Sequence, residues 1–144
     1  MTILTAGPQH LPAWADMRAA LWPEEDRGAL RTEAGELMKH NRCHVLLAEC
    51  DELVAGFIEL TLRSHVEGCG SSPAGYVEAW FVAPAYRSRG VGATLMKAAE
   101  QWCREQGCRH IGSDTEVTNA RSRAAHRALG FTELPASVGF FKSL

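Results

Sequence analysis

The sequence lacks the features of a membrane or exported protein. None of its apolar runs is long enough to cross a bilayer, and no basic region followed by an apolar block stands near its N-terminus. Its five cysteines are an odd number without a C-x-x-C pair, which argues against a disulfide framework and a zinc site. The six histidines show no metal-ligand spacing. We therefore expect a cytoplasmic protein that engages neither a membrane nor a metal.

Internal repeats, low-complexity segments and long linkers are also absent. The chain has 144 residues, of which 46% are hydrophobic and 22% charged, as in ordinary soluble globular proteins. This length is sufficient for a substantial core. We expect one domain covering residues 1–144.

The small net charge of the chain conceals an uneven distribution. The total is −2, but residues 1–82 include 12 acidic and 6 basic residues, whereas residues 83–144 include 5 acidic and 9 basic ones. A basic C-terminal half suits a phosphorylated cofactor and an acidic N-terminal half suits a cationic substrate, although these charges can equally be solvated surface. The pI of about 6.3 argues against nucleic acid as a partner.

Hydrophobic periodicity and turn residues predict a mixture of strands and helices. The expected strands are 2–5, 44–50, 53–63, 76–82, 110–113, 131–133 and 138–142. The expected helices are 8–22, 27–40, 90–106 and 119–129. Leu11, Trp14, Arg18 and Leu21 would share one face of the first helix. This order predicts an α/β protein with a central sheet covered by helices.

The segment after the strand 76–82 is the most informative one. It comprises Val82 and then Arg87, Ser88, Arg89, Gly90, Val91, Gly92 and Ala93. A helix start directs several backbone N–H groups at one point, where an anion such as phosphate is stabilised. The glycines permit close approach of a ligand and the arginines add charge. The spacing Arg-x-x-Gly-x-Gly fits neither the dinucleotide fingerprint nor the P-loop. A basic, glycine-rich helix start without a ligand is the alternative.

This loop resembles the pyrophosphate-binding loop of the GNAT N-acetyltransferases. A second stretch, Asn119-x-x-Ser122-x-x-x-His126-x-x-x-Gly130-Phe131, is similar to another signature of that family. The resemblance implies the GNAT fold, a central mixed, largely antiparallel sheet with splayed fourth and fifth strands, flanked by about four helices. These two strands would be 76–82 and 110–113. Acetyl-CoA would enter the gap between them as co-substrate, without a metal.

Further blocks are similar to the short bacterial aminoglycoside 6'-N-acetyltransferases. They are Leu21-Trp22-Pro23, Glu67-Gly68-Cys69, Tyr76-Val77-Glu78-Ala79-Trp80-Phe81-Val82, Ser113-Asp114-Thr115 and Ala128-Leu129-Gly130-Phe131. The resemblance implies acetyl transfer to the 6'-amine of an aminoglycoside by direct attack in a ternary complex, which gives antibiotic resistance. It also implies a homodimer built through the C-terminal strands. The chain departs from the subfamily at His65 and Phe141, where Tyr is common. An acetyltransferase for a polyamine, an amino sugar or a peptide N-terminus and a non-catalytic acyl-CoA-binding module are the alternatives.

The resemblance also implies roles for individual side chains. Asn119 and Ser122 would join the loop in binding acetyl-CoA, and a backbone N–H near Val82 would polarise the thioester carbonyl. Glu78 or Asp114 would be the base, and His126 would protonate the leaving thiolate. The residues expected to border the substrate are Trp22, Glu24, His65, Glu78 and Asp114.

Each catalytic candidate has a structural alternative. Glu78 would share a strand face with Tyr76, Trp80 and Val82, where its carboxylate could meet a bound ammonium or form a salt bridge with Arg63.

Three further candidates are equally open. Asp114 could cap a helix or a turn, and His126 could bond a nearby carbonyl of its own helix. Trp22 could be the core end of the first helix instead of a cleft wall.

Overall fold

A computed structural model describes all residues 1–144, which form two compact units, 1–113 and 114–144. The strands of the first unit are β1 (Thr2–Thr5), β2 (Cys43–Cys50), β3 (Leu53–Arg63), β4 (Ala74–Val82) and β5 (Ile111–Ser113). Its helices are η1 (Pro8–His10), α1 (Leu11–Leu21), α2 (Arg27–Leu37), η2 (Pro84–Tyr86) and α3 (Val91–Glu105). The second unit contains α4 (Ala120–Ala128). The single domain expected from the sequence stays a prediction.

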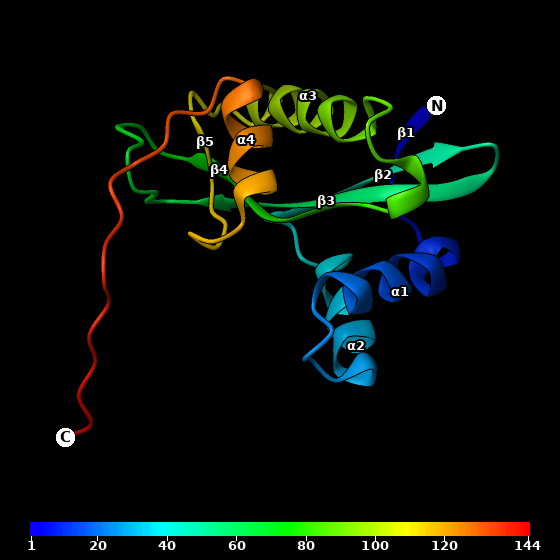
Figure 1. Ribbon diagram of the computed structural model, residues 1–144, viewed down its shortest axis with the longest axis horizontal. Helices are drawn as coiled ribbons and strands as arrows, with labels where there is room; N and C mark the ends of the chain where they lie inside the picture. Colours follow the sequence, from blue (N-terminus) through cyan, green and yellow to red (C-terminus); the bar gives the residue numbers. More distant parts are fainter. The chain divides into compact units, whose positions relative to one another are not determined.

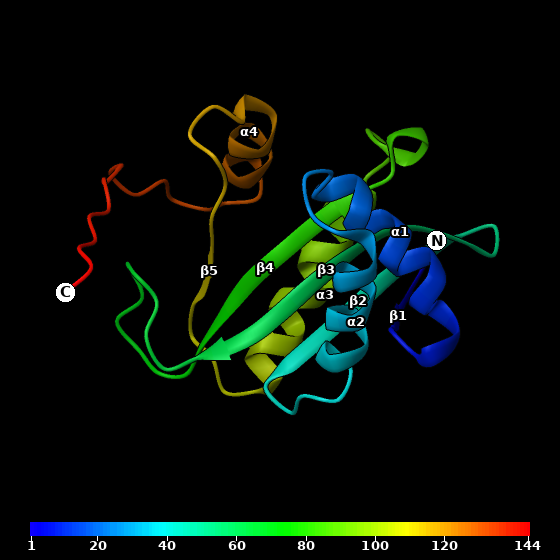
Figure 2. The same ribbon diagram turned by 90° about the horizontal axis from the view of Figure 1, so that it is seen from below.

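The five strands form one mixed sheet in the order β1-β2-β3-β4-β5, whose neighbouring strands can be followed in Figure 2. Strands β1 to β4 are antiparallel neighbours, whereas β4 and β5 are parallel. The β4–β5 ladder joins only Gly75–Val77 to Ile111–Ser113, so the rest of β4 has no β5 neighbour. The expected mixed, largely antiparallel sheet with a splayed fourth and fifth strand is confirmed.

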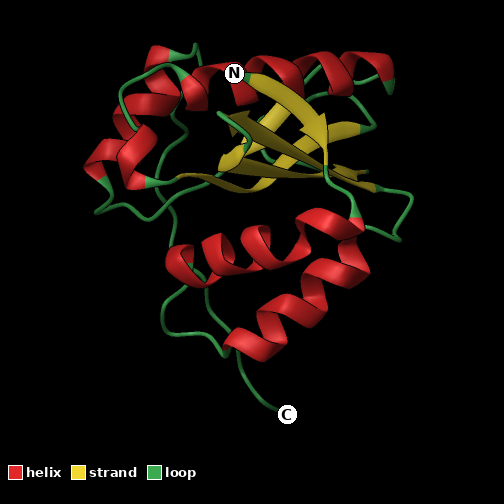
Figure 3. Cartoon of the chain, turned by 90° about the vertical axis from the view of Figure 1, so that its right-hand side faces the viewer, coloured by secondary structure: helices red, strands yellow, loops and turns green.

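Helices cover both faces of this sheet, with α3 on one face and α1 and α2 on the other (Figures 1 and 3). Trp14 is fully buried where α1 meets the sheet, and Leu11 and Leu21 pack against the same core cluster. Arg18 is buried on this face too, so the predicted face of the first helix is confirmed. None of the helices has the length and apolar character that a membrane span requires.

The opposite core is built on α3, whose apolar residues recur at helical spacing. Leu95, Met96, Ala99 and Cys103 are buried against the sheet. A Cβ at Gly75 of β4 would collide with the Cys103 sulfur, so glycine is needed there for α3 to approach. Burial raises the pKa of the Cys103 thiol to about 12, which makes it a packing residue and not a nucleophile.

A buried ion pair ties α1 and α2 to the sheet. Arg18 and Glu59 are 2% and 3% exposed, and Arg18 Nε donates to Glu59 Oε1 over 2.8 Å. Arg18 also donates to the Leu30 carbonyl oxygen over 2.6 Å and pairs with Glu33, both on α2. Trp14 Nε1 donates to the same Glu59 oxygen over 3.0 Å. The charges are thus paired and hydrogen-bonded, as burial demands.

The structure corrects the sequence at the C-terminus. The two strands expected at 131–133 and 138–142 are absent, because no strand of this chain supplies hydrogen-bond partners to that segment. Residues 138–142 are exposed, with Phe140 and Phe141 at 94% and 96%. The second helix also ends at Leu37, three residues before the expected limit.

Candidate active site

The loop after β4 has the geometry of an anion site. Gly90 precedes the first residue of α3 and has φ +79°, a left-handed conformation that favours glycine. Thr94 is the first residue of α3 whose N–H bonds back, to the Gly90 carbonyl. The N–H groups of Val91, Gly92 and Ala93 therefore lie in the first turn, at the positive end of the helix dipole. This is the place where the sequence predicts a pyrophosphate.

The two arginines of this loop have different surroundings. Arg87 Nε donates to the Val82 carbonyl oxygen over 2.8 Å, and its guanidinium lies 5.6 Å from the Phe81 ring centroid. Arg87 thus braces the loop against the end of β4. The guanidinium of Arg89 lies over the Tyr86 ring at 5.8 Å. Contact of Arg87 and Arg89 with the cofactor stays a prediction.

Gly92 has a packing role that the sequence did not indicate. A Cβ at this position would lie 3.2 Å from Cζ2 of Trp80. The indole of β4 therefore packs beneath the start of α3, and glycine leaves room for it. Serine at 88 also has a positive φ, +62°, so the loop turns sharply just before the helix.

The backbone of Val82 faces the splayed edge of the sheet. Ala83 N donates to the Ala55 carbonyl oxygen over 2.9 Å, so the peptide groups of its neighbour Val82 point away from β3. On that side the β5 ladder has already ended at Val77 and Ser113. An N–H at this edge is placed as an oxyanion donor must be, directed into a gap between strands.

A β-bulge at Glu78 changes the expected face pattern of β4. In the ladder with β3, Glu59 pairs with Ala79 and Leu60 pairs with Val77, which leaves Glu78 as the extra residue. Beyond the bulge, Ala79 belongs to the core cluster that contains Trp14 of α1, whereas Trp80 packs against α3.

The expectation that Tyr76, Glu78, Trp80 and Val82 share one face is therefore wrong. Glu78 bonds Thr61 and Arg63, which lie two and four residues after Glu59 and on its face of β3. The carboxylate accordingly lies on the α1/α2 side of the sheet, and Trp80 lies on the α3 side.

The Glu78 carboxylate is held by three short hydrogen bonds. Its Oε1 accepts from Thr61 Oγ1 at 2.6 Å and from Arg63 Nη2 and Nε at 2.6 and 3.1 Å. The Arg63 guanidinium stacks 3.7 Å from the centroid of the Tyr76 ring. The salt bridge that the sequence left open for Glu78 is present. Its side chain is still 33% exposed, and its role toward a substrate stays a prediction.

Trp22 and Glu24 lie in the connection between α1 and α2. Trp22 is half-buried, packs against the core cluster, and lies with its ring centroid 5.0 Å from the Arg18 guanidinium carbon. The core position that the sequence left open for Trp22 is therefore observed. Glu24 is exposed, and Asp26 accepts a hydrogen bond from Ala29 N as the cap of α2. Contact of Trp22 and Glu24 with a substrate stays a prediction.

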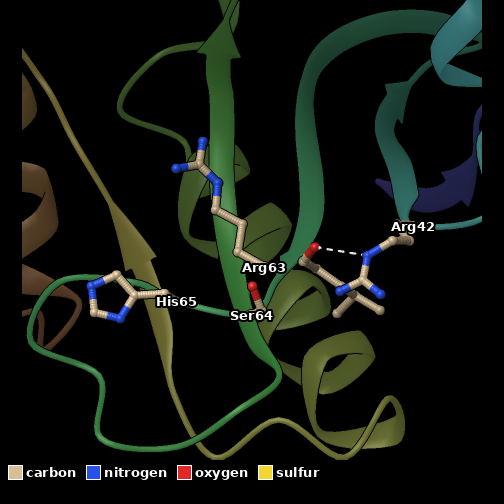
Figure 4. A pocket seen from close by; sticks show the side chains of 5 residues that line it. Arg42, Arg63, Ser64 and His65 are labelled. Atoms are coloured by element: carbon tan, nitrogen blue, oxygen red, sulfur yellow. Dashed lines mark hydrogen bonds between the residues drawn. The ribbon is translucent and has the colours of Figure 1, made fainter.

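His65 lines an open surface concavity of about 460 Å³ where β3 ends (Figure 4). The other lining residues are Arg42, Leu62, Arg63 and Ser64. Arg42 Nε donates to the Leu62 carbonyl oxygen over 3.2 Å, and the close-up shows Arg42 and His65 on either side of Ser64. The two arginines of this lining are hydrogen-bond donors only and offer no acceptor to a cationic amine. The predicted substrate role of His65 is therefore not supported by this hollow and stays a prediction.

In the second unit, Asn119 and Ser122 begin α4. The Asn119 side chain accepts from Ser122 N over 3.0 Å, which is an N-cap. The cap of α4 is thus made by Asn119, and the helix or turn cap that the sequence left open for Asp114 stays a prediction. Asp114 is exposed and follows directly after β5 in the chain. The predicted cofactor contacts of Asn119 and Ser122 stay predictions.

His126 bonds a carbonyl of its own helix, which was the alternative from the sequence. Its Nδ1 lies 2.7 Å from the Ser122 carbonyl oxygen, so Nδ1 carries a proton that it donates. The ring meets Phe131 edge-on at 5.2 Å. A proton given to a leaving thiolate would therefore come from Nε2 of the imidazolium form, and this role stays a prediction.

Sequence reasoning missed the residues that hold these side chains. Thr61 contacts Glu78 across the sheet, but nothing in its local pattern indicates this because the contact depends on strand register. Glu59 could have been noticed, since a carboxylate in an otherwise apolar stretch of β3 requires a partner.

Known proteins share both the sequence and the architecture of this chain. Residues 11–131 match the model of the Acetyltransferase (GNAT) family. The chain is 39% identical over 140 residues to Aminoglycoside N(6')-acetyltransferase type 1 of Stenotrophomonas maltophilia, which spans 96% of this chain and 91% of that protein.

Two solved structures are similar over almost their whole length. One is AAC(6')-Iy in complex with the bisubstrate analog CoA-S-monomethyl-acetylneamine, with a TM-score of 0.93, 33% identity and coverage of 99% and 98% of the two chains. The other is apo AAC(6')-IG of Acinetobacter haemolyticus, with a TM-score of 0.94, 32% identity and coverage of 100% and 99%. The match of the family model over most of the sequence, together with these relatives, shows that the chain belongs to the acetyltransferase (GNAT) family.

Proposed function

We propose that the protein transfers the acetyl group of acetyl-CoA to the 6'-amine of aminoglycoside antibiotics. The observation that carries the proposal is the likeness, at 33% identity and a TM-score of 0.93, to a chain whose bound ligand joins CoA to an acetylated aminoglycoside fragment. The relative from Stenotrophomonas maltophilia is named as an aminoglycoside N(6')-acetyltransferase, which specifies the same 6' position. Since acetyl-CoA is a metabolite of the cytoplasm, we expect the enzyme to act there. Because acetylation modifies the antibiotic, we expect the enzyme to confer resistance to aminoglycosides.

The cofactor end of the reaction follows from the loop before α3. The first-turn N–H groups of Val91, Gly92 and Ala93 would bind the pyrophosphate, with Arg89 adding charge and Arg87 holding the loop to β4. Ser88 contributes its backbone to the same turn. The pantetheine arm would then extend into the splay of β4 and β5, toward Val82. Contacts of Asn119 and Ser122 with that arm are proposed from the family resemblance alone.

The chemistry requires no covalent enzyme intermediate. The amine attacks the thioester carbon, a C–N bond forms, and the C–S bond breaks as the tetrahedral intermediate collapses. The Val82 N–H would stabilise the developing oxyanion. Glu78 or Asp114 would take a proton from the ammonium, directly or through water, and the CoA thiolate would gain one from His126 or from solvent.

The C-terminal segment suits a homodimer. Val138, Phe140 and Phe141 are 80%, 94% and 96% exposed, which is unusual for large apolar side chains. We propose that residues 138–142 pair with a second copy, where their backbone N–H and C=O groups would find partners. Light scattering at micromolar concentration tests this, because a monomeric mass for the full chain would exclude a stable dimer and leave the chemistry untouched.

Thiol release from acetyl-CoA tests the catalytic proposal. Assays would contain tobramycin, spermidine, glucosamine, an alanyl peptide or no acceptor, with the acetylated product identified by mass spectrometry. We expect turnover with tobramycin to exceed the other acceptors by at least about a hundredfold in kcat/KM, which is about 2.7 kcal/mol of discrimination. Preference for spermidine would favour a polyamine acetyltransferase, and binding of acetyl-CoA without transfer to any amine would favour a non-catalytic module.

A further inference from the structure

All three hydrogen bonds to the Glu78 carboxylate reach a single oxygen. An arginine commonly donates one N–H to each oxygen of a carboxylate in a parallel fork. Here both Nε and Nη2 of Arg63 donate to Oε1, and so does Thr61 Oγ1. Oε2 is the oxygen that these donors leave for another cation. The bulge on β4 turns this carboxylate to the α1/α2 face of the sheet, and its side chain keeps 33% of its surface in contact with solvent.

The donors themselves are fixed by their surroundings. Thr61 lies in the paired part of β3, two residues before the strand ends, in register with Tyr76. The Arg63 guanidinium carbon lies over the Tyr76 ring, 3.7 Å from its centroid, and this contact limits the directions in which the guanidinium can donate. The carboxylate is thus held by groups on two paired strands and not by a mobile loop.

From this geometry we infer that Thr61 and Arg63 are positioning residues for Glu78. They bind Oε1 so that Oε2 is presented, in one orientation, to the amine of the substrate or to the water that accepts its proton. The inference rests on the proposed acetyl transfer. It adds that the orientation of the base is set by a threonine and an arginine that do not themselves touch the substrate.

This role has a kinetic signature that a substrate-binding or merely structural role lacks. Arg63 is a cation, so its removal cannot weaken the attraction of a polycationic substrate. Loss of orientation instead slows the chemical step. Thr61→Val and Arg63→Met should therefore each lower kcat by about tenfold, the equivalent of one charge-assisted hydrogen bond, while the KM for tobramycin stays unchanged or falls.

A double-mutant cycle identifies the residue through which Thr61 acts. In a Glu78→Ala protein there is no carboxylate to orient, so adding Thr61→Val should change kcat by less than about twofold. Thr61→Ser keeps the hydroxyl and Arg63→Lys keeps a cationic donor, so we expect each to recover part of kcat. Arg42→Met is the matched control, because it removes a neighbouring cation that bonds the Leu62 carbonyl and not Glu78. We expect wild-type kinetics from it.

The outcomes separate this inference from the proposed function. Each variant is assayed below its own Tm, which is measured by circular dichroism, so that only folded proteins are compared. If Thr61→Val does not fold, Thr61→Ala, which also lacks the hydroxyl, takes its place. The inference is overturned by wild-type kcat in Thr61→Val, by a raised KM with unchanged kcat in Arg63→Met, or by an undiminished effect of Thr61→Val in the Glu78→Ala background. A wild-type protein that acetylates no aminoglycoside overturns the proposed function itself.

Discussion

Removal of the Arg18 guanidinium is expected to destabilise the protein strongly. Arg18→Met replaces the side chain by one of similar length but leaves Glu59 only 3% exposed without its cationic partner. Breaking a buried ion pair in this way costs about 3–5 kcal/mol, because one charge stays buried and uncompensated. The Leu30 carbonyl loses its donor as well. For a chain of this size the expected decrease in Tm is roughly 6–20 °C.

The pH dependence of the free energy of unfolding tests separately whether the buried Glu59 charge causes this loss of stability. Burial raises the pKa of the Glu59 carboxyl, against the opposing influence of Arg18 and Trp14. A carboxyl whose folded-state pKa is raised contributes most stability below its unfolded pKa, about 4.3, and loses that contribution as the pH rises through its folded pKa. Removal of the guanidinium raises the pKa of Glu59 further. The stability difference between Arg18→Met and the wild type should therefore narrow as the pH falls from neutral toward the unfolded pKa of this carboxyl.

Urea unfolding at several pH values measures the loss of stability in Arg18→Met and its pH dependence. The m-values of the variant and the wild type show whether the two proteins unfold in the same way. The second variant, Arg18→Met with Glu59→Gln, removes both charges but keeps an acceptor for Trp14 Nε1, and should recover about 2 kcal/mol of the loss. A cost below about 1 kcal/mol for Arg18→Met, or a stability difference that does not change with pH, would show that the buried charge is not the cause.

Three further predictions follow from other parts of the molecule. Gly90→Val should raise the KM for acetyl-CoA at least about tenfold. Gly90→Asn should do the same, although asparagine tolerates the φ of +79°. A normal KM in the Asn variant would exclude a close approach of acetyl-CoA to the backbone at this residue. His44 stacks on Trp102 with the ring centroids 4.9 Å apart, and burial lowers the pKa of its imidazole. His44 therefore stabilises the fold above about pH 6.5 and loses that contribution as the pH falls through its folded pKa. The free energy of unfolding in urea should depend less on pH in His44→Phe than in the wild type. The Cys103 thiol should react with a disulfide reagent only after unfolding, and fast labelling of the native protein would contradict its burial.

The sequence predicts most of the first unit because its patterns are local. Alternation and turn residues locate β2, β3 and β4 to within about two residues, and the glycine-rich run locates the start of α3. What it could not predict depends on pairing between distant segments. The bulge at Glu78 is a property of the β3–β4 register, and it reverses which side chains share a face. The C-terminal run 138–142 has strand-like residues, but this chain offers it no strand to pair with.

The same distinction applies to the candidate site. The position of the anion-binding loop could be predicted because a helix start and two glycines are adjacent in sequence. The partners of Glu78 could only be proposed as one of two alternatives, and the structure adds Thr61, whose contact crosses two strands. The resemblance to a family implied roles for these residues, and their individual contributions stay predictions.

Acetyl transfer to the 6'-amine is the central claim, and a comparison of two aminoglycosides tests it most directly. Kanamycin A has an amine at the 6' position, whereas paromomycin has a hydroxyl there and amines elsewhere. With the purified full chain and acetyl-CoA, we expect thiol release with kanamycin A and a kcat/KM for paromomycin lower by at least about a thousandfold, since the reacting group is missing. Equal turnover of the two antibiotics, or a product acetylated at another amine, would contradict the account.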